Sequence, residues 1–135
     1  MLNQEAKELF DQGIKTLNEG NILAALSHLE KASRIEENPL INSFLAFCIA
    51  KERGQIQKAV SLCKDAIKED QGNSFHYLNL GKIYLLEKKN EEAVNIFRQG
   101  LHHEENQQIV DELNKLGTRK PPIISFLKRS NFSNV

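Results

Sequence analysis

The densest group of titratable side chains in this sequence is the run His102, His103, Glu104 and Glu105. Such residue types could hold a metal ion, but adjacent residues on a helix point about 100° apart, so these four side chains do not converge. The histidine pair at i and i+4 of a zinc-binding HExxH motif is also missing. We therefore expect neither a metal site nor a catalytic role at this position.

The other nucleophiles and bases are scattered along the chain. Cys48 and Cys63 lie in apolar surroundings without CxxC spacing, which predicts buried free thiols. His28 and His76 are isolated, no glycine-rich phosphate loop follows a strand pattern, and no nucleophile has an evident base beside it. These observations predict a protein that is not an enzyme, takes no small-molecule substrate and needs no cofactor. His76 lies beside the ligand groove that is predicted below.

The composition is that of a folded single domain. Of the 135 residues, 40% are hydrophobic and 27% are charged. Lys plus Arg and Asp plus Glu each number 18, so no net field draws the chain to nucleic acid or to an anionic membrane. MLNQEAKELF, the first ten residues, contains no apolar run of signal-peptide length, and no segment approaches the roughly 18 apolar residues that span a bilayer. We expect a cytoplasmic protein.

Residues 118–135 differ from the rest of the chain. They contain four cations and no acid, which leaves residues 1–117 with a net charge of −4. Pro121 and Pro122 forbid a helix and favour an extended course for the apolar strip IISFL, whose Ile123 and Phe126 are the predicted contact residues. We predict an extended basic and apolar tail. It packs on its own last helices, lies in a groove of its own or a neighbouring molecule, or stays free for a partner.

A 34-residue period organises the rest of the sequence. Small or apolar residues recur at three positions: Ala25, Ala59 and Ala93; Leu29, Cys63 and Phe97; Ala32, Ala66 and Gly100. Upstream of the third set lie Tyr77, Leu80, Gly81 and Tyr84. This pattern resembles the tetratricopeptide repeat, in which an aromatic, Leu-Gly and Tyr precede Ala, Phe and Ala. The resemblance covers about residues 5–105, and the proline-containing end is similar to that of small bacterial members of the family.

The resemblance implies an all-α fold, a right-handed α-solenoid of three antiparallel helix pairs with a capping helix and a tail. Stacked pairs are needed because one pair cannot bury its apolar face alone. We predict a domain over residues 1–117 with repeats at about 5–38, 39–72 and 73–106. The predicted helices span 3–18, 22–35, 39–52, 56–69, 74–87, 91–103 and 107–116. Asn38 before Pro39 and Asn90 before two acids are predicted helix starts. The positions of close helix approach are Gly13, Ala25, Ala32, Ala46, Ala59, Ala66, Gly81, Ala93 and Gly100.

Ala46 falls at a position of close helix approach only if the second repeat is shifted by one residue relative to the 34-residue period. A strict count of 34 puts bulky Phe47 where Gly13 and Gly81 stand in the other repeats. We prefer the slipped register, with the extra residue absorbed in the turn at residues 51–54. A shift of one residue turns each side chain by about 100° around the helix axis, so the register decides whether Phe44 or Phe47 faces outward. The slipped register predicts that Phe47 does.

The family binds its ligands on the concave face, which is lined by the first helix of each pair. We transfer the groove positions of the family residue by residue to this sequence. They fall on Phe10, Ile14, Leu17, Phe47, Ala50, Lys51, Phe75, Leu78, Lys82 and Leu85. This surface is mainly apolar, as at many interaction sites. The carboxylate clamp of Lys, Asn and Arg that some members use is absent, because the corresponding positions carry Phe10, Ile14, Phe75 and Asn79. Lys82 or Lys51 remains available to anchor one acidic group.

Two functions follow from these patterns. The favoured one is a non-catalytic adaptor that binds a peptide or helix of another protein in the apolar groove. The alternative is an accessory protein that contacts nucleic acid or a membrane surface through its basic tail, with the repeats as spacer or dimeriser. A homodimer through the terminal repeats or the tail is compatible with both.

Overall fold

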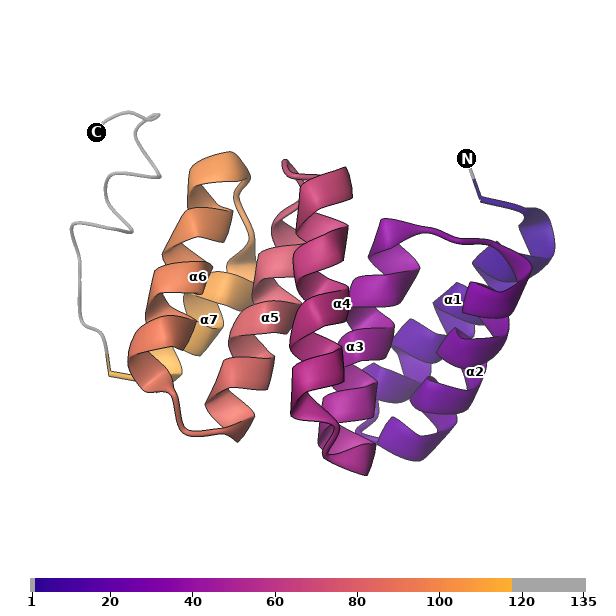
Figure 1. The fold of residues 1–135 in the computed structure, drawn as a ribbon, viewed down its shortest axis with the longest axis horizontal. Helices are drawn as coiled ribbons and strands as arrows, with labels where there is room; N and C mark the ends of the chain where they lie inside the picture. The colour runs from indigo at the N-terminus through magenta and orange to yellow at the C-terminus, as the bar shows by residue number, and fades with distance from the viewer. Residues whose placement is uncertain (1, 118–135) are drawn as a thin grey trace.

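The computed structural model describes residues 2–117, in which seven helices and no strands are found. The helices are α1 (Gln4–Asn18), α2 (Ile22–Ile35), α3 (Pro39–Arg53), α4 (Ile56–Glu69), α5 (Ser74–Leu86), α6 (Asn90–His103) and α7 (Gln107–Lys115). The pairs α1–α2, α3–α4 and α5–α6 follow one another along the long axis of the molecule, and α7 lies at the far end beside α6 (Figure 1). The all-α solenoid predicted from the repeat is confirmed. The predicted tail lies outside the described residues.

Asparagine begins most of these helices. Asn3, Asn21, Asn38, Asn73 and Asn106 each precede a helix, and each side chain accepts a hydrogen bond from a backbone N–H of the first turn. Such a cap typically contributes about 1 kcal/mol because it satisfies a donor that the helix leaves unpaired. The predicted start at Asn90 is wrong by one residue. Asn90 is itself the first residue of α6, and the preceding Lys89 makes no side-chain cap.

The turn inside each pair needs a residue with a positive backbone φ. Gly20 (84°), Gly54 (69°) and Lys88 (59°) provide it at intervals of 34 residues. Gly54 ends α3 directly after Arg53, so residues 51–53 continue the helix and do not form the turn assigned to them above. Glycine adopts this conformation without steric cost, whereas the Cβ of Lys88 makes it unfavourable.

Close approach of the two helices in a pair is visible at three glycines. A Cβ on Gly81 would lie 2.1 Å from Cε1 of Phe97, and one on Gly13 would lie 2.8 Å from the Leu29 side chain. A Cβ on Gly100 would lie 2.7 Å from Cβ of Tyr77. These helices can pack at their present distance only because these positions lack a side chain.

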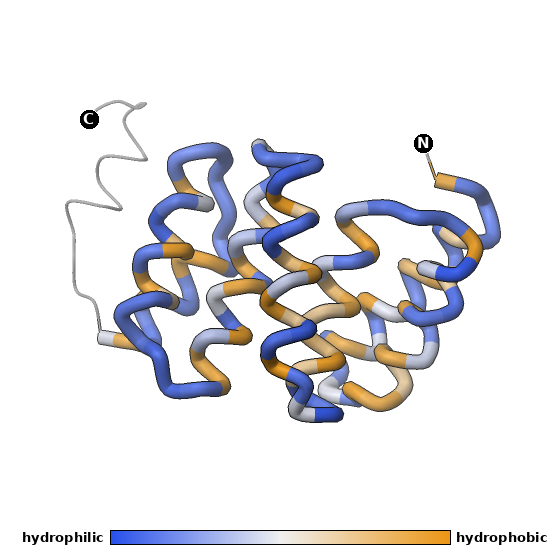
Figure 2. The backbone as a smooth tube through the Cα atoms, viewed as in Figure 1, coloured by the Kyte–Doolittle hydropathy of each residue, from blue (hydrophilic) through white to orange (hydrophobic). Residues whose placement is uncertain are grey.

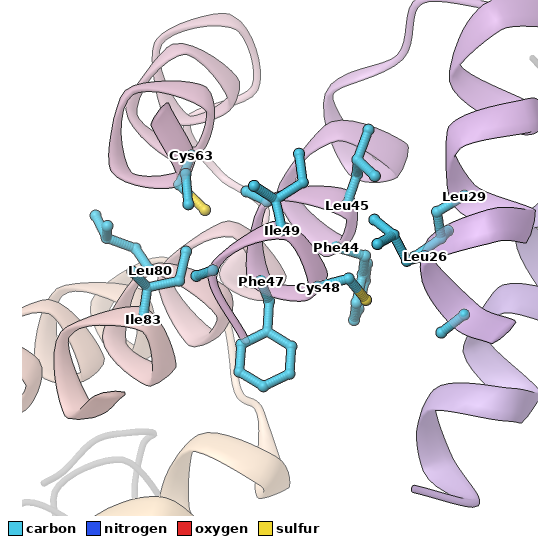
Figure 3. Packing of buried hydrophobic residues seen from close by; sticks show 14 residues of the cluster. Leu26, Leu29, Phe44, Leu45, Phe47, Cys48, Ile49, Cys63, Leu80 and Ile83 are labelled. Atoms are coloured by element: carbon cyan, nitrogen blue, oxygen red, sulfur yellow. The ribbon is translucent and has the colours of Figure 1, made fainter. Parts of the chain in front are cut away.

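The buried core runs through the array as two clusters. The larger one is centred on α3, whose residues 43–50 are all buried because α2, α4 and α5 surround the helix. Figure 3 shows its packing, with Phe47 projecting from the opposite side of α3 to Ile49. The smaller cluster joins α5, α6 and α7 through Leu78, Phe97 and Ile109. The turns between helices are mainly hydrophilic, and the apolar stretches lie within the helices (Figure 2).

None of the helices in residues 2–117 is long and apolar enough to cross a lipid bilayer.

Candidate functional site: an aromatic groove on the first helices

The first helices of the three pairs together enclose a pocket of about 370 Å³, which we call the aromatic groove. Its lining residues are Phe10, Ile14, Leu17, Asn18, Ile22, Leu40, Phe44, Phe47, Phe75, Lys82 and Gln108. Apart from Ile22 on α2 and Gln108 on α7, all of them belong to α1, α3 and α5. One face of the solenoid therefore brings together residues that are about a hundred positions apart in the sequence.

Three phenylalanines form a row along the groove, one from the first helix of each pair. The Phe10 and Phe44 ring centroids are 5.8 Å apart with the rings inclined by 70°, an edge-to-face arrangement. The Phe44 and Phe75 centroids are 5.7 Å apart at 41°. Aromatic pairs in such geometries gain about 0.5–1.5 kcal/mol beyond the burial of their surface. The row is therefore held in place before any ligand binds.

Lys82 supplies the cation of the groove. Its Nζ lies 4.4 Å from the centroid of the Phe47 ring, a cation–π contact. Burial lowers the pKa of Lys82, whereas the nearby carboxylate of Glu112 acts in the opposite direction. The ammonium is thus partly removed from water and lies against an aromatic face.

The groove residues proposed from the sequence fall into two groups. Phe10, Ile14, Leu17, Phe47, Phe75 and Lys82 line the aromatic groove. Leu78 does not, because it is 1% exposed and packs in the smaller core cluster, against which Leu85 also packs. Ala50 is buried in the larger cluster, and exposed Lys51 does not line the pocket. Ile123 and Phe126 lie outside the described residues.

Sequence reasoning missed five lining residues: Asn18, Ile22, Leu40, Phe44 and Gln108. Phe44 stands 34 residues after Phe10, so the strict count would have found it, while the slipped count finds Phe47 next to Ala46. Both phenylalanines line the groove, and fully buried Ala46 lies between them in the sequence. The prediction that only one of Phe44 and Phe47 faces the groove was therefore wrong, because the face of α3 toward the groove holds both side chains. The repeat pattern could not indicate Gln108, because α7 lies outside the repeat.

A polar network joins α3, the end of α4 and α5, away from the groove lining. His76 Nδ1 is 2.9 Å from Ser43 Oγ, and His76 Nε2 is 3.0 Å from Asp70 Oδ2. Asn79 Nδ2 also donates to Ser43 Oγ, at 3.4 Å. The sequence did not indicate this base beside a hydroxyl, because the residues come from separate segments. Ser43 and His76 are both 0% exposed, so the arrangement joins helices and presents no nucleophile to a substrate.

Within residues 2–117, no three His, Cys, Asp or Glu side chains gather in a way that could hold a metal ion.

The comparison with protein families identifies the repeat. Residues 50–113, from the end of α3 to α7, match the family model described as tetratricopeptide repeat. These residues are similar to the tetratricopeptide repeat. The match covers the end of α3, all of α4, α5 and α6, and most of α7, and α1 and α2 form a further helix pair of the same array. No protein among the curated sequences matches the chain.

Solved tetratricopeptide domains have the same fold at low sequence identity. The first such domain of Spaghetti (RPAP3), bound to the HSP90 peptide SRMEEVD, is 23% identical with a TM-score of 0.66, over 87% of this chain and 96% of that one. The corresponding domain of human RPAP3 is 21% identical with a TM-score of 0.66, over 93% and 97% of the two chains. The Sgt2 domain from Aspergillus fumigatus is 18% identical with a TM-score of 0.69, over 99% and 88%. The tetratricopeptide fold is a protein-interaction scaffold.

Proposed function

We propose that this protein is a non-catalytic adaptor that binds an apolar segment of another protein in the aromatic groove. The observation that carries the proposal is the row of Phe10, Phe44 and Phe75, which continues to Phe47 along one pocket. A concave, preformed and mainly apolar surface with a few polar groups is typical of binding sites. The scaffold function of the repeat family supports the same proposal.

The energetics favour a ligand with a few large anchors. Burying one aliphatic or aromatic side chain of a partner contributes roughly 1.5–3 kcal/mol, and a few anchors usually dominate the affinity of an interface. Because the ring contacts of Phe44 hold the row in place, little ordering of the groove accompanies binding. An extended peptide or one face of an amphipathic helix can present such anchors.

The ligand differs in character from the peptide SRMEEVD that is bound to the Spaghetti domain. The lining of the aromatic groove contains one cation, Lys82, and Asn79 is 0% exposed and bonded to Ser43. We therefore propose that apolar side chains, and not a set of charge pairs, provide most of the binding energy.

The test uses a displayed library of short random peptides as the probe. Peptides are selected on the full chain and then measured against Ile14→Asp, which puts a carboxylate on the groove lining at a half-buried position. Leu23→Asp is the matched control, because Leu23 is apolar, 63% exposed and outside the groove. Circular dichroism and thermal unfolding verify that both variants are folded.

We expect apolar consensus peptides whose binding falls at least tenfold with Ile14→Asp and is unchanged with Leu23→Asp. If the selected peptides bind both variants equally well, the groove is not the site. Binding that survives Ile14→Asp but is lost on deletion of residues 118–135 would assign capture to the tail. Tail binding would also weaken steeply between about 50 and 200 mM salt, as electrostatic contacts do.

A further inference from the structure

The aromatic groove contains a cation that lacks a charged partner. No ion pair of residues 2–117 includes Lys82, and its ammonium lies 4.4 Å from the centroid of the Phe47 ring. Lysine usually lays its stem on apolar surface and keeps its ammonium in water. Here α5 places Lys82 on the lining of the groove, so part of the cost of desolvating the ammonium is already met in the folded protein.

The charges around Lys82 leave an excess of positive potential. Glu112 on α7 is the acid with the largest influence on Lys82, but its Oε2 already pairs with Lys115 Nζ at 3.5 Å. Lys115 and Lys51 both act on Lys82 as like charges. Two further cations and one engaged carboxylate thus act on Lys82, and a further carboxylate would be attracted to it.

We propose that the segment bound in the aromatic groove carries an aspartate or glutamate beside its apolar anchors, and that this carboxylate pairs with Lys82. The inference rests on the proposed function and adds the charge of the partner. Lys82 and the phenylalanine row line the same pocket, so one short segment reaches both. A pair formed beside apolar rings is screened less than one at the open surface.

The same argument excludes basic occupants. A lysine or arginine beside Lys82 would be repelled by it, and the acid that acts on Lys82, Glu112, is already paired with Lys115. Residues 118–135 contain four cations and no acid, so the side chains of the tail of this chain have the wrong charge to pair with Lys82. An external acidic and apolar segment is the occupant that the charges favour.

The experiment uses the same displayed library, with every peptide fused through its C-terminus so that only side-chain carboxylates are presented. Selection is repeated on the wild type and on Lys82→Met, which keeps the length of the apolar stem. The strongest wild-type peptide is then synthesised with amidated ends, once with its acid and once with the amide isostere. Lys82→Arg serves as the conservative variant. Lys64→Met is the matched control, because Lys64 is exposed on α4 and outside the groove.

We expect the wild type to bind the acidic peptide about tenfold more tightly than its amide isostere, the usual size of a hydrogen bond to a charged group. Lys82→Met should bind the two peptides equally, while Lys82→Arg and Lys64→Met should keep the preference. The amide peptide should still bind through its apolar anchors.

The outcomes separate the two proposals. A wild-type consensus that is apolar without an acid, or a preference that survives Lys82→Met, overturns the carboxylate inference and leaves the groove function intact. A basic consensus resembling residues 118–135 overturns the inference in favour of the tail. Selected peptides that bind Ile14→Asp as tightly as the wild type overturn the groove function itself.

Discussion

Gly81 of α5 lies directly against the ring of Phe97 on α6, at a distance that leaves no room for a methyl group. A Cβ added at Gly81 would lie 2.1 Å from Cε1 of Phe97, which is 0% exposed and cannot swing into solvent. In the first pair the corresponding residues are Gly13 and Leu29, where an added Cβ would lie 2.8 Å from the leucine side chain.

Gly81→Ala should destabilise the protein by about 1–3 kcal/mol or more, because the core around Phe97 must shift to accept the methyl group. Chemical denaturation gives the free energy of unfolding. Gly72→Ala is the control, since a Cβ at Gly72 meets nothing within 4 Å. Phe97→Leu added to Gly81→Ala should cost less than the sum of the two single changes, as coupled neighbours do. Additive costs would show that the two residues are not coupled through this contact.

Lys88→Gly should stabilise the protein by about 1 kcal/mol. Lys88 has a φ of 59° at the position where the first two pairs have Gly20 and Gly54, and glycine relieves the strain of its Cβ. Lys88→Ala removes the charge but keeps a Cβ, so it should bring no such gain. The midpoint of thermal unfolding measures both variants. An equal gain for both would attribute the effect to charge and not to the backbone.

His76 should make stability depend on pH below neutrality. Burial lowers the pKa of His76 below its usual 6.5, although the hydrogen bond and charge of Asp70 act in the opposite direction. As the pH falls through 6.5, the unfolded chain therefore takes up the proton before the folded one, and the stability present above that pH is progressively lost. His76→Gln should unfold with a shallower pH dependence between neutrality and pH 5. A steeper dependence in the variant would contradict the sign of this shift.

The two thiols should be unreactive while the protein is folded. Burial raises the pKa of Cys48 to about 12 and also raises the pKa of Cys63, whose Sγ donates to the backbone oxygen of Ser43. Because the thiolate is the nucleophile, maleimide labelling at pH 8 should be slow in buffer and complete in denaturant. Leu23→Cys, at a 63% exposed position, should add one rapidly labelled thiol. Rapid labelling of the wild type would mean that the core opens locally.

The 34-residue period was sufficient to predict the six paired helices in residues 2–117 and most of their bounds, because small residues must recur wherever two helices approach closely. Local chemistry was also informative, since Asn38 before Pro39 begins α3 and Gly54 ends it. Such signals depend on the backbone of a few neighbouring residues, which the sequence displays directly.

The sequence also predicted that phenylalanines would gather on the first helices, but not which of them share a pocket. Phe10 meets Phe44, and Lys82 meets Phe47, only through the stacking angle between successive pairs. Leu78 is buried in a cluster with residues of α6 and α7, and the link from Ser43 through His76 to Asp70 joins three separate segments. The period determined which helices form because it is a property of local spacing. The groove and the buried network depend on distances between helices, and only the tertiary packing decides those.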